Sequence, residues 1–138
     1  MFSNNRDAYR QAFFTVWQKY QKQLPLEPVE RELAQIMIEH PEYHYLLEKP
    51  DSFQQQEFSL EENPFFHMSL HLAIRDQLRL RKPVGVDSVY HALLQRGFSS
   101  HQAEHQMMAC LAESMWEAQQ KGEIPKEESY LIKLQKIL

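Results

Sequence analysis

The sequence has little glycine, little cysteine and no excess of positive charge, and each shortage excludes a class of protein. Three glycines in 138 residues are too few for the tight turns of a β-sandwich or barrel, so we expect an all-α fold. The one cysteine, Cys110, has no partner for an internal disulfide and is interpreted as a small packed residue. The net charge of -4 lacks the basic field that grips phosphate backbones, which argues against a nucleic-acid partner.

The chain also lacks a signal peptide and any apolar run of about eighteen residues, the length that a membrane span requires. We therefore expect a cytoplasmic protein without membrane contact. A chain of this length is expected to fold as one helical domain, residues 1–138, which buries about two thirds of its unfolded surface. Nothing in the sequence distinguishes a monomer from a homodimer.

The apolar segment that begins at Asn63 predicts a buried central helix at about residues 64–81. Asn63 is a favourable N-cap, and Pro64 takes the first helical position, where its missing N–H costs nothing. At 100° per residue, four large apolar side chains share one face of this helix: Phe66, Leu70, Ile74 and Leu78. A helix that is apolar around most of its girth belongs in the middle of a bundle.

Helical spacing of apolar residues predicts the other members of a compact bundle of six or seven helices. They are expected at about residues 5–23, 28–40, 41–48, 87–96, 99–121 and 126–137. Ser99 and Gln102 have the spacing of a capping box, and Gly122 suits a left-handed helix terminator. Residues 49–62 show no sustained period and are expected to be irregular, a length of loop that is often mobile or functional.

Histidine carries the chemical signal in this sequence. Six of the seven histidines form three pairs with a spacing of four residues: His40 and His44, His67 and His71, His101 and His105. On a helix this spacing brings two imidazoles close enough to bind one metal ion. We predict a site for a divalent metal (zinc, iron or manganese) with His67, His71 and His105 as ligands, and a wider set that adds His40, His44 and His101.

Glu104 is the candidate for a catalytic role. The segment His101-Gln-Ala-Glu104-His105 matches the H-x-x-E-H pattern of inverted zinc peptidases, in which two histidines hold zinc and the glutamate activates water. We therefore predict Glu104 as a fourth ligand or general base. If the protein is an enzyme, a metal-dependent, hydrolase-like activity is expected.

A second hypothesis needs no metal. Buried histidines usually bond to backbone carbonyls, carboxylates or hydroxyls, so the pairs are also consistent with a structural histidine core. The protein would then be a non-enzymatic interaction or adaptor protein. Phe53 and Phe58, on the irregular segment, would be exposed aromatic side chains that dock onto a protein partner.

Several longer motifs resemble a known family. They are His40-Pro-Glu-Tyr-His44, the stretch from Asn63 to Arg75, the stretch from Ala103 to Glu113, and Trp116-Glu-Ala-Gln119. Together they resemble the small bacterial proteins catalogued as domain of unknown function eighteen forty-one. The resemblance spans nearly the whole chain and implies a small helical cytosolic protein. It implies no reaction, substrate or partner.

Overall fold

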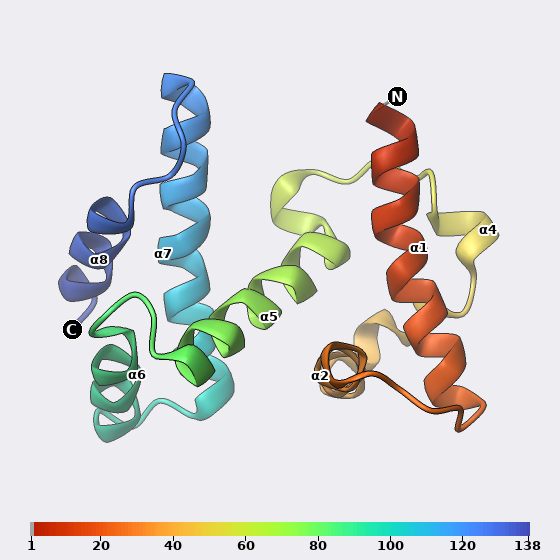
Figure 1. Ribbon diagram of the computed structural model, residues 1–138, viewed down its shortest axis with the longest axis horizontal. Helices are drawn as coiled ribbons and strands as arrows, with labels where there is room; N and C mark the ends of the chain where they lie inside the picture. The colour runs from red at the N-terminus through yellow and green to blue at the C-terminus, as the bar shows by residue number, and fades with distance from the viewer. Residues whose placement is uncertain (1) are drawn as a thin grey trace. The chain divides into compact units, whose positions relative to one another are not determined.

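The computed structural model describes residues 2–138 and, over these residues, contains helices and turns without strands, which confirms the all-α prediction (Figure 1). Six helices have at least ten residues: α1 (Phe2–Gln21), α2 (Pro28–Ile38), α5 (Pro64–Leu80), α6 (Val86–Gln95), α7 (Ser100–Lys121) and α8 (Glu127–Lys136). Four shorter elements are α3 (His44–Leu47), α4 (Pro50–Phe53) and the 3-10 turns η1 (Pro41–Tyr43) and η2 (Leu60–Glu62).

The chain divides into two compact units, one that ends at Leu72 and one that comprises Ala73–Leu138. The boundary falls inside α5, which therefore contributes residues to both units. Each unit is described separately. The expectation of one domain over residues 1–138 stays a prediction. None of the helices in the described part of the chain is both long enough and apolar enough to span a membrane.

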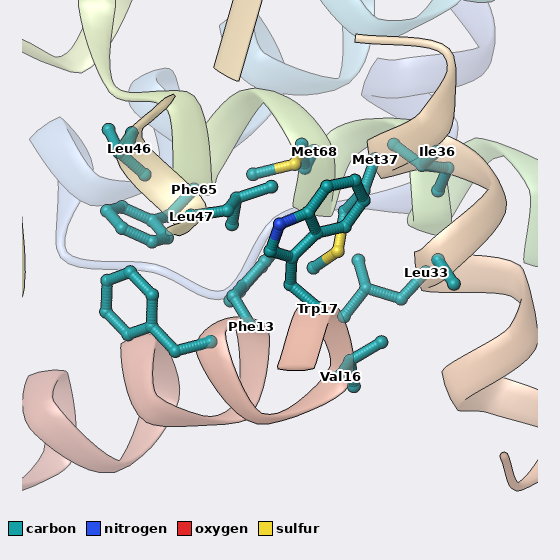
Figure 2. Close-up of a cluster of buried hydrophobic side chains, with 12 residues drawn as sticks. Phe13, Val16, Trp17, Leu33, Ile36, Met37, Leu46, Leu47, Phe65 and Met68 are labelled. Carbon is teal, nitrogen blue, oxygen red and sulfur yellow. The ribbon is translucent and has the colours of Figure 1, made fainter. Parts of the chain in front are cut away.

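The first unit has an apolar core built by α1, α2, α3 and the start of α5. Figure 2 shows the core side chains, which come together from all four elements around Trp17. Phe14 is fully buried here, whereas Tyr9 and Tyr20 are 44% and 40% exposed. The two tyrosines lie at the edge of the buried face, where an aromatic ring keeps its hydroxyl near water.

Residues 49–62 are more ordered than predicted. This segment contains the single turn α4 and the 3-10 turn η2. It is held against α1 by Arg10, whose Nη1 donates to the carbonyls of Phe53, Gln54 and Gln56 at 3.2, 3.0 and 2.7 Å. Arg10 itself is only 4% exposed. The buried guanidinium of Arg10 therefore donates hydrogen bonds to backbone carbonyls of this segment. The apolar periodicity of the sequence does not predict these bonds.

The prediction that Phe53 and Phe58 are exposed docking residues is wrong. Both side chains are partly buried and pack against the core of the first unit. The Phe58 ring lies 6.3 Å from the Phe65 ring, and the Arg10 guanidinium lies 5.5 Å from the Phe58 ring centroid. Both phenylalanine rings are partly buried because the hydrogen bonds from Arg10 hold the backbone of this segment against α1.

Helix α5 begins as predicted. Asn63 Oδ1 accepts the backbone N–H groups of Phe65 and Phe66 at 3.0 and 3.1 Å, which satisfies two donors that the helix cannot use internally. The helix is buried along much of its length, with the exposed Leu80 at its end. Phe65 and Met68 are fully buried, whereas the predicted Phe66 is only partly buried.

The second unit consists of the rest of α5 with α6, α7 and α8, and Figure 1 shows α7 and α8 side by side. The capping box of α7 is present, since Ser99 Oγ accepts from Gln102 N and Gln102 Oε1 accepts from Ser99 N. Gly122 ends the helix in the left-handed region at φ 66°, also as predicted. Gly85, at φ 99°, is the N-cap of α6, which begins at Val86.

The buried face of α7 includes Met107, Cys110 and Ser114, whereas Met115 is 39% exposed. In α8 the buried residues are Tyr130 and Leu134, and Leu138, beyond the end of the helix, is 44% exposed. Tyr130 is buried because its hydroxyl has a partner, the Oε1 atom of Gln77 at 2.6 Å.

Replacing Arg10 with methionine should destabilise the protein by about 1 to 3 kcal/mol, because three partly buried hydrogen bonds to backbone carbonyls are lost. Methionine has similar length and no charge, so the packing changes little. The exposed Arg31 provides the control, and Arg31→Met should change the free energy of unfolding by less than about 0.5 kcal/mol. Urea denaturation measures both. Equal stability of the two variants would contradict the role given to Arg10.

Cys110 should not react with thiol reagents while the protein is folded. The residue is 5% exposed, and burial raises the pKa of its thiol, so little thiolate is present near pH 8. Titration with Ellman's reagent should show slow labelling of the native protein and rapid, complete labelling in concentrated guanidinium chloride. Native labelling as fast as that of a small free thiol would show that this face of α7 is open.

Candidate metal centre

His40 lies where α2 ends. Pro41 disfavours a helical conformation in the residue before it, and His40 leaves the helix with φ −123° and ψ 67°. The ring turns back on the helix end, where its Nδ1 donates to the Ile36 carbonyl oxygen at 2.7 Å. This bond satisfies one of the last carbonyls of α2 and fixes the tautomer with hydrogen on Nδ1. The Nε2 atom therefore carries the lone pair that a metal ligand needs.

His67 and His71 lie one turn apart on α5. Their ring centroids are 4.8 Å apart, and the two Nε2 atoms face each other at 3.2 Å. His71 has no exposed surface, and His67 is partly buried. The four-residue spacing thus does what the sequence predicts, since it brings two imidazole nitrogens to one point on a helix face.

The first unit brings His40 to this pair. The His40 ring centroid lies 5.2 Å from that of His67 and 4.8 Å from that of His71, and His40 is 2% exposed. Each ring offers one nitrogen such that these three atoms lie within 4.8 Å of one another. The turn after α2 and the helix α5 therefore place three imidazoles around one point.

The spacing of these nitrogens suits a metal ion. Zinc–nitrogen bonds of about 2.0 to 2.1 Å at tetrahedral angles place two ligand nitrogens about 3.3 Å apart. The observed Nε2 to Nε2 distance in the His67 and His71 pair is 3.2 Å. His40 has the additional feature of metal-binding histidines, a bond from its other ring nitrogen to a backbone carbonyl.

His44 is not brought to this cluster. The chain bends at η1, so His44 does not follow His40 on a continuous helix. Its ring lies 4.4 Å from the Trp17 ring, and its Nε2 bonds to the Met37 carbonyl oxygen at 2.8 Å. The bend at Pro41 separates the two histidines of this pair, and His44 has a structural environment.

The remaining predicted residues lie in the second unit, on α7. His101 and His105 have ring centroids 4.3 Å apart, so this pair also forms at the expected spacing. The Glu104 side chain is 8% exposed and pairs with Arg75, whose Nε lies 3.1 and 3.3 Å from its two oxygens. A carboxylate that neutralises a guanidinium in this way has a structural role of its own. The ligand roles of His101, His105 and Glu104, and the catalytic role of Glu104, stay predictions.

The stacking of Tyr43 on a histidine of the cluster was not predicted from the sequence. Tyr43 stacks on His40 with ring centroids 5.4 Å apart and an interplanar angle of 2°, and it meets His67 edge-on at 6.1 Å. Burial raises the pKa of its phenol, and the nearby Glu42 charge acts in the same direction, so the phenol keeps its proton at neutral pH. The i, i+3 spacing of His40 and Tyr43 across a proline is the feature of the sequence from which this stacking could have been predicted.

The fold and the site define a class of protein, an all-helical chain with a buried histidine cluster able to hold a metal ion. The chain belongs to the family described as Domain of unknown function (DUF1841), whose sequence model matches residues 5–136. This confirms the family resemblance found in the sequence motifs. Comparison with curated proteins and with solved structures finds no match.

Removing the Glu104 carboxylate separates a structural role of this residue from a role as metal ligand. Glu104→Ala should cost about 1 to 3 kcal/mol, because the partly buried Arg75 loses its counter-charge. The exposed Glu113 on the same helix is the control, and Glu113→Ala should change stability by less than about 0.5 kcal/mol. Urea denaturation and metal analysis are made on the same samples. An unchanged stability together with a lower uptake of added zinc than in the parent protein would instead identify Glu104 as a ligand.

Proposed function

We propose that this protein binds a divalent transition metal through His40, His67 and His71. The observation that carries the proposal is the geometry of the three rings in the first unit, above all the 3.2 Å separation of the His67 and His71 Nε2 atoms. His40 supports it, because its Nδ1 is already bonded to a carbonyl and its Nε2 is the ligating atom.

The donor set favours particular metals. Imidazole nitrogen suits zinc, iron, copper and nickel, whereas manganese and magnesium prefer carboxylate and water oxygens. Of the three metals expected from the sequence, zinc and iron fit three imidazoles better than manganese does. The sequence-based expectation that His105 is a further ligand becomes part of this proposal, and a fourth imidazole would complete a tetrahedral shell.

The alternative is a structural histidine core in which one ring donates a hydrogen bond to the other. It accounts for the contact between His67 and His71 without a metal. The two readings differ in what metal does to stability. An ion that binds only the folded state raises the melting temperature by mass action, and a chelator reverses the effect. A core of hydrogen-bonded histidines responds to neither.

The test uses the full chain purified without a histidine tag. After removal of metal with a chelator, titration with zinc should saturate at about one equivalent and raise the melting temperature. His67→Ala, at the most accessible of the three ligands, should weaken zinc binding by more than about 100-fold, since losing a ligand exceeds the 10- to 100-fold cost of losing an outer-shell partner.

Two further variants serve as a control and as a test of the fourth ligand. His91→Ala is the matched control, because His91 is an exposed histidine on α6 whose Nδ1 bonds to the Asp87 carbonyl oxygen. It should bind zinc as the parent protein does. His105→Ala should weaken binding if His105 is the fourth ligand. The proposal would be overturned if the parent protein takes up neither zinc nor iron and its melting temperature does not change with chelator. The histidines would then have a structural role.

A further inference from the structure

The turn that follows His40 has a geometry that places a tyrosine over the histidine ring. His40, Pro41, Glu42 and Tyr43 form a 3-10 turn, in which the backbone N–H of Tyr43 donates to the His40 carbonyl oxygen at 2.9 Å. Side chains three residues apart are eclipsed in a 3-10 helix. The observed result is a parallel stack of the His40 and Tyr43 rings, with an interplanar angle of 2°.

Two of the contacts of the His40 ring restrain its orientation in different ways, in addition to its contacts with the His67 and His71 rings. The bond from Nδ1 to the Ile36 carbonyl oxygen holds one edge of the ring. The flat face of Tyr43 restricts rocking of the ring about that bond. Tyr43 also packs against the apolar core and makes a T-shaped contact with the His67 ring. These contacts fix the position of the Tyr43 ring independently of its contact with His40.

We propose that Tyr43 is a positioning residue for the metal site, which keeps the His40 ring in the orientation where its Nε2 is directed at His67 and His71. The inference rests on the proposed metal site. The stacking face of the ring performs this role, so the hydroxyl is dispensable. Outer-shell residues that orient a ligand typically change metal affinity by 10- to 100-fold.

Three variants test this role. Tyr43→Leu keeps an apolar side chain in contact with the core but removes the flat face, and it should weaken zinc binding by about 10- to 100-fold. Tyr43→Phe keeps the face and should bind zinc as the parent does. Tyr45→Leu is the control, because Tyr45 is the next tyrosine in the chain, is 58% exposed and packs on Phe53 instead of a histidine.

The measurements separate positioning from general destabilisation. Zinc affinity is determined by competition with a chromogenic chelator well below the melting temperature of each metal-free variant. The visible spectrum of the cobalt-substituted protein reports ligand geometry, and it should change in Tyr43→Leu and stay unchanged in Tyr43→Phe. Pro41→Ala loosens the turn without removing a packed ring, so it should lower affinity in the same direction even if Tyr43→Leu folds poorly.

The outcomes are distinguishable from failure of the metal site itself. If the parent protein binds zinc and Tyr43→Leu and Pro41→Ala bind it equally well, the positioning role is overturned while the metal site stands. If Tyr43→Phe is as weak as Tyr43→Leu, the hydroxyl matters and the stacking argument is wrong. If the parent protein binds no metal, both proposals fail.

Discussion

An imidazole ring that is buried among apolar side chains must have partners for its nitrogens. This requirement determines how the histidines of the first unit are arranged. His40 and His71 are almost fully buried beside a core of phenylalanine, leucine and methionine side chains. Transferring such groups from water without compensating bonds costs several kcal/mol. The unit meets this cost by directing one nitrogen of His40 to a helix-end carbonyl and by facing the Nε2 atoms of His67 and His71 toward each other. The three rings converge because each is restrained from a different direction.

The rest of the unit supports this convergence. Asn63 begins α5 at a defined residue, so His67 and His71 have a fixed rotation about the helix axis. Arg10 ties the preceding segment to α1 through three carbonyls, which defines the path of the chain into Asn63. Pro41 ends α2 and turns His40 out of the helix. Local rules of capping, proline geometry and buried charge therefore determine where the ligand-capable nitrogens lie.

Local patterns predicted the parts of the site that lie within one helix. The His67 and His71 pair, the Asn63 cap and the capping box at Ser99 depend only on spacing along a helix, and all are present. Tertiary features were harder to predict. The association of His40 with α5 depends on how helices pack. The separation of His44 depends on the size of the bend at Pro41, which the sequence leaves open.

Other errors have the same origin. Residues 49–62 were predicted to be irregular and their two phenylalanines to be exposed, because periodicity contains no information about a buried arginine 40 or more residues away. The buried face of α7 is hard to predict because Met, Ala and Cys occupy several faces of that helix and give no sharp apolar stripe. The burial of Tyr130 is hard to predict because its hydroxyl needs a partner from another helix, which Gln77 provides.

X-ray absorption spectroscopy on the metal-loaded protein tests the central claim most directly, because it reports the atoms bound to the ion without any substitution. The account predicts a first shell with three or four nitrogen neighbours at about 2.0 to 2.1 Å for zinc, together with the multiple scattering that is characteristic of imidazole rings. A shell of oxygen or sulfur atoms without imidazole scattering would contradict it.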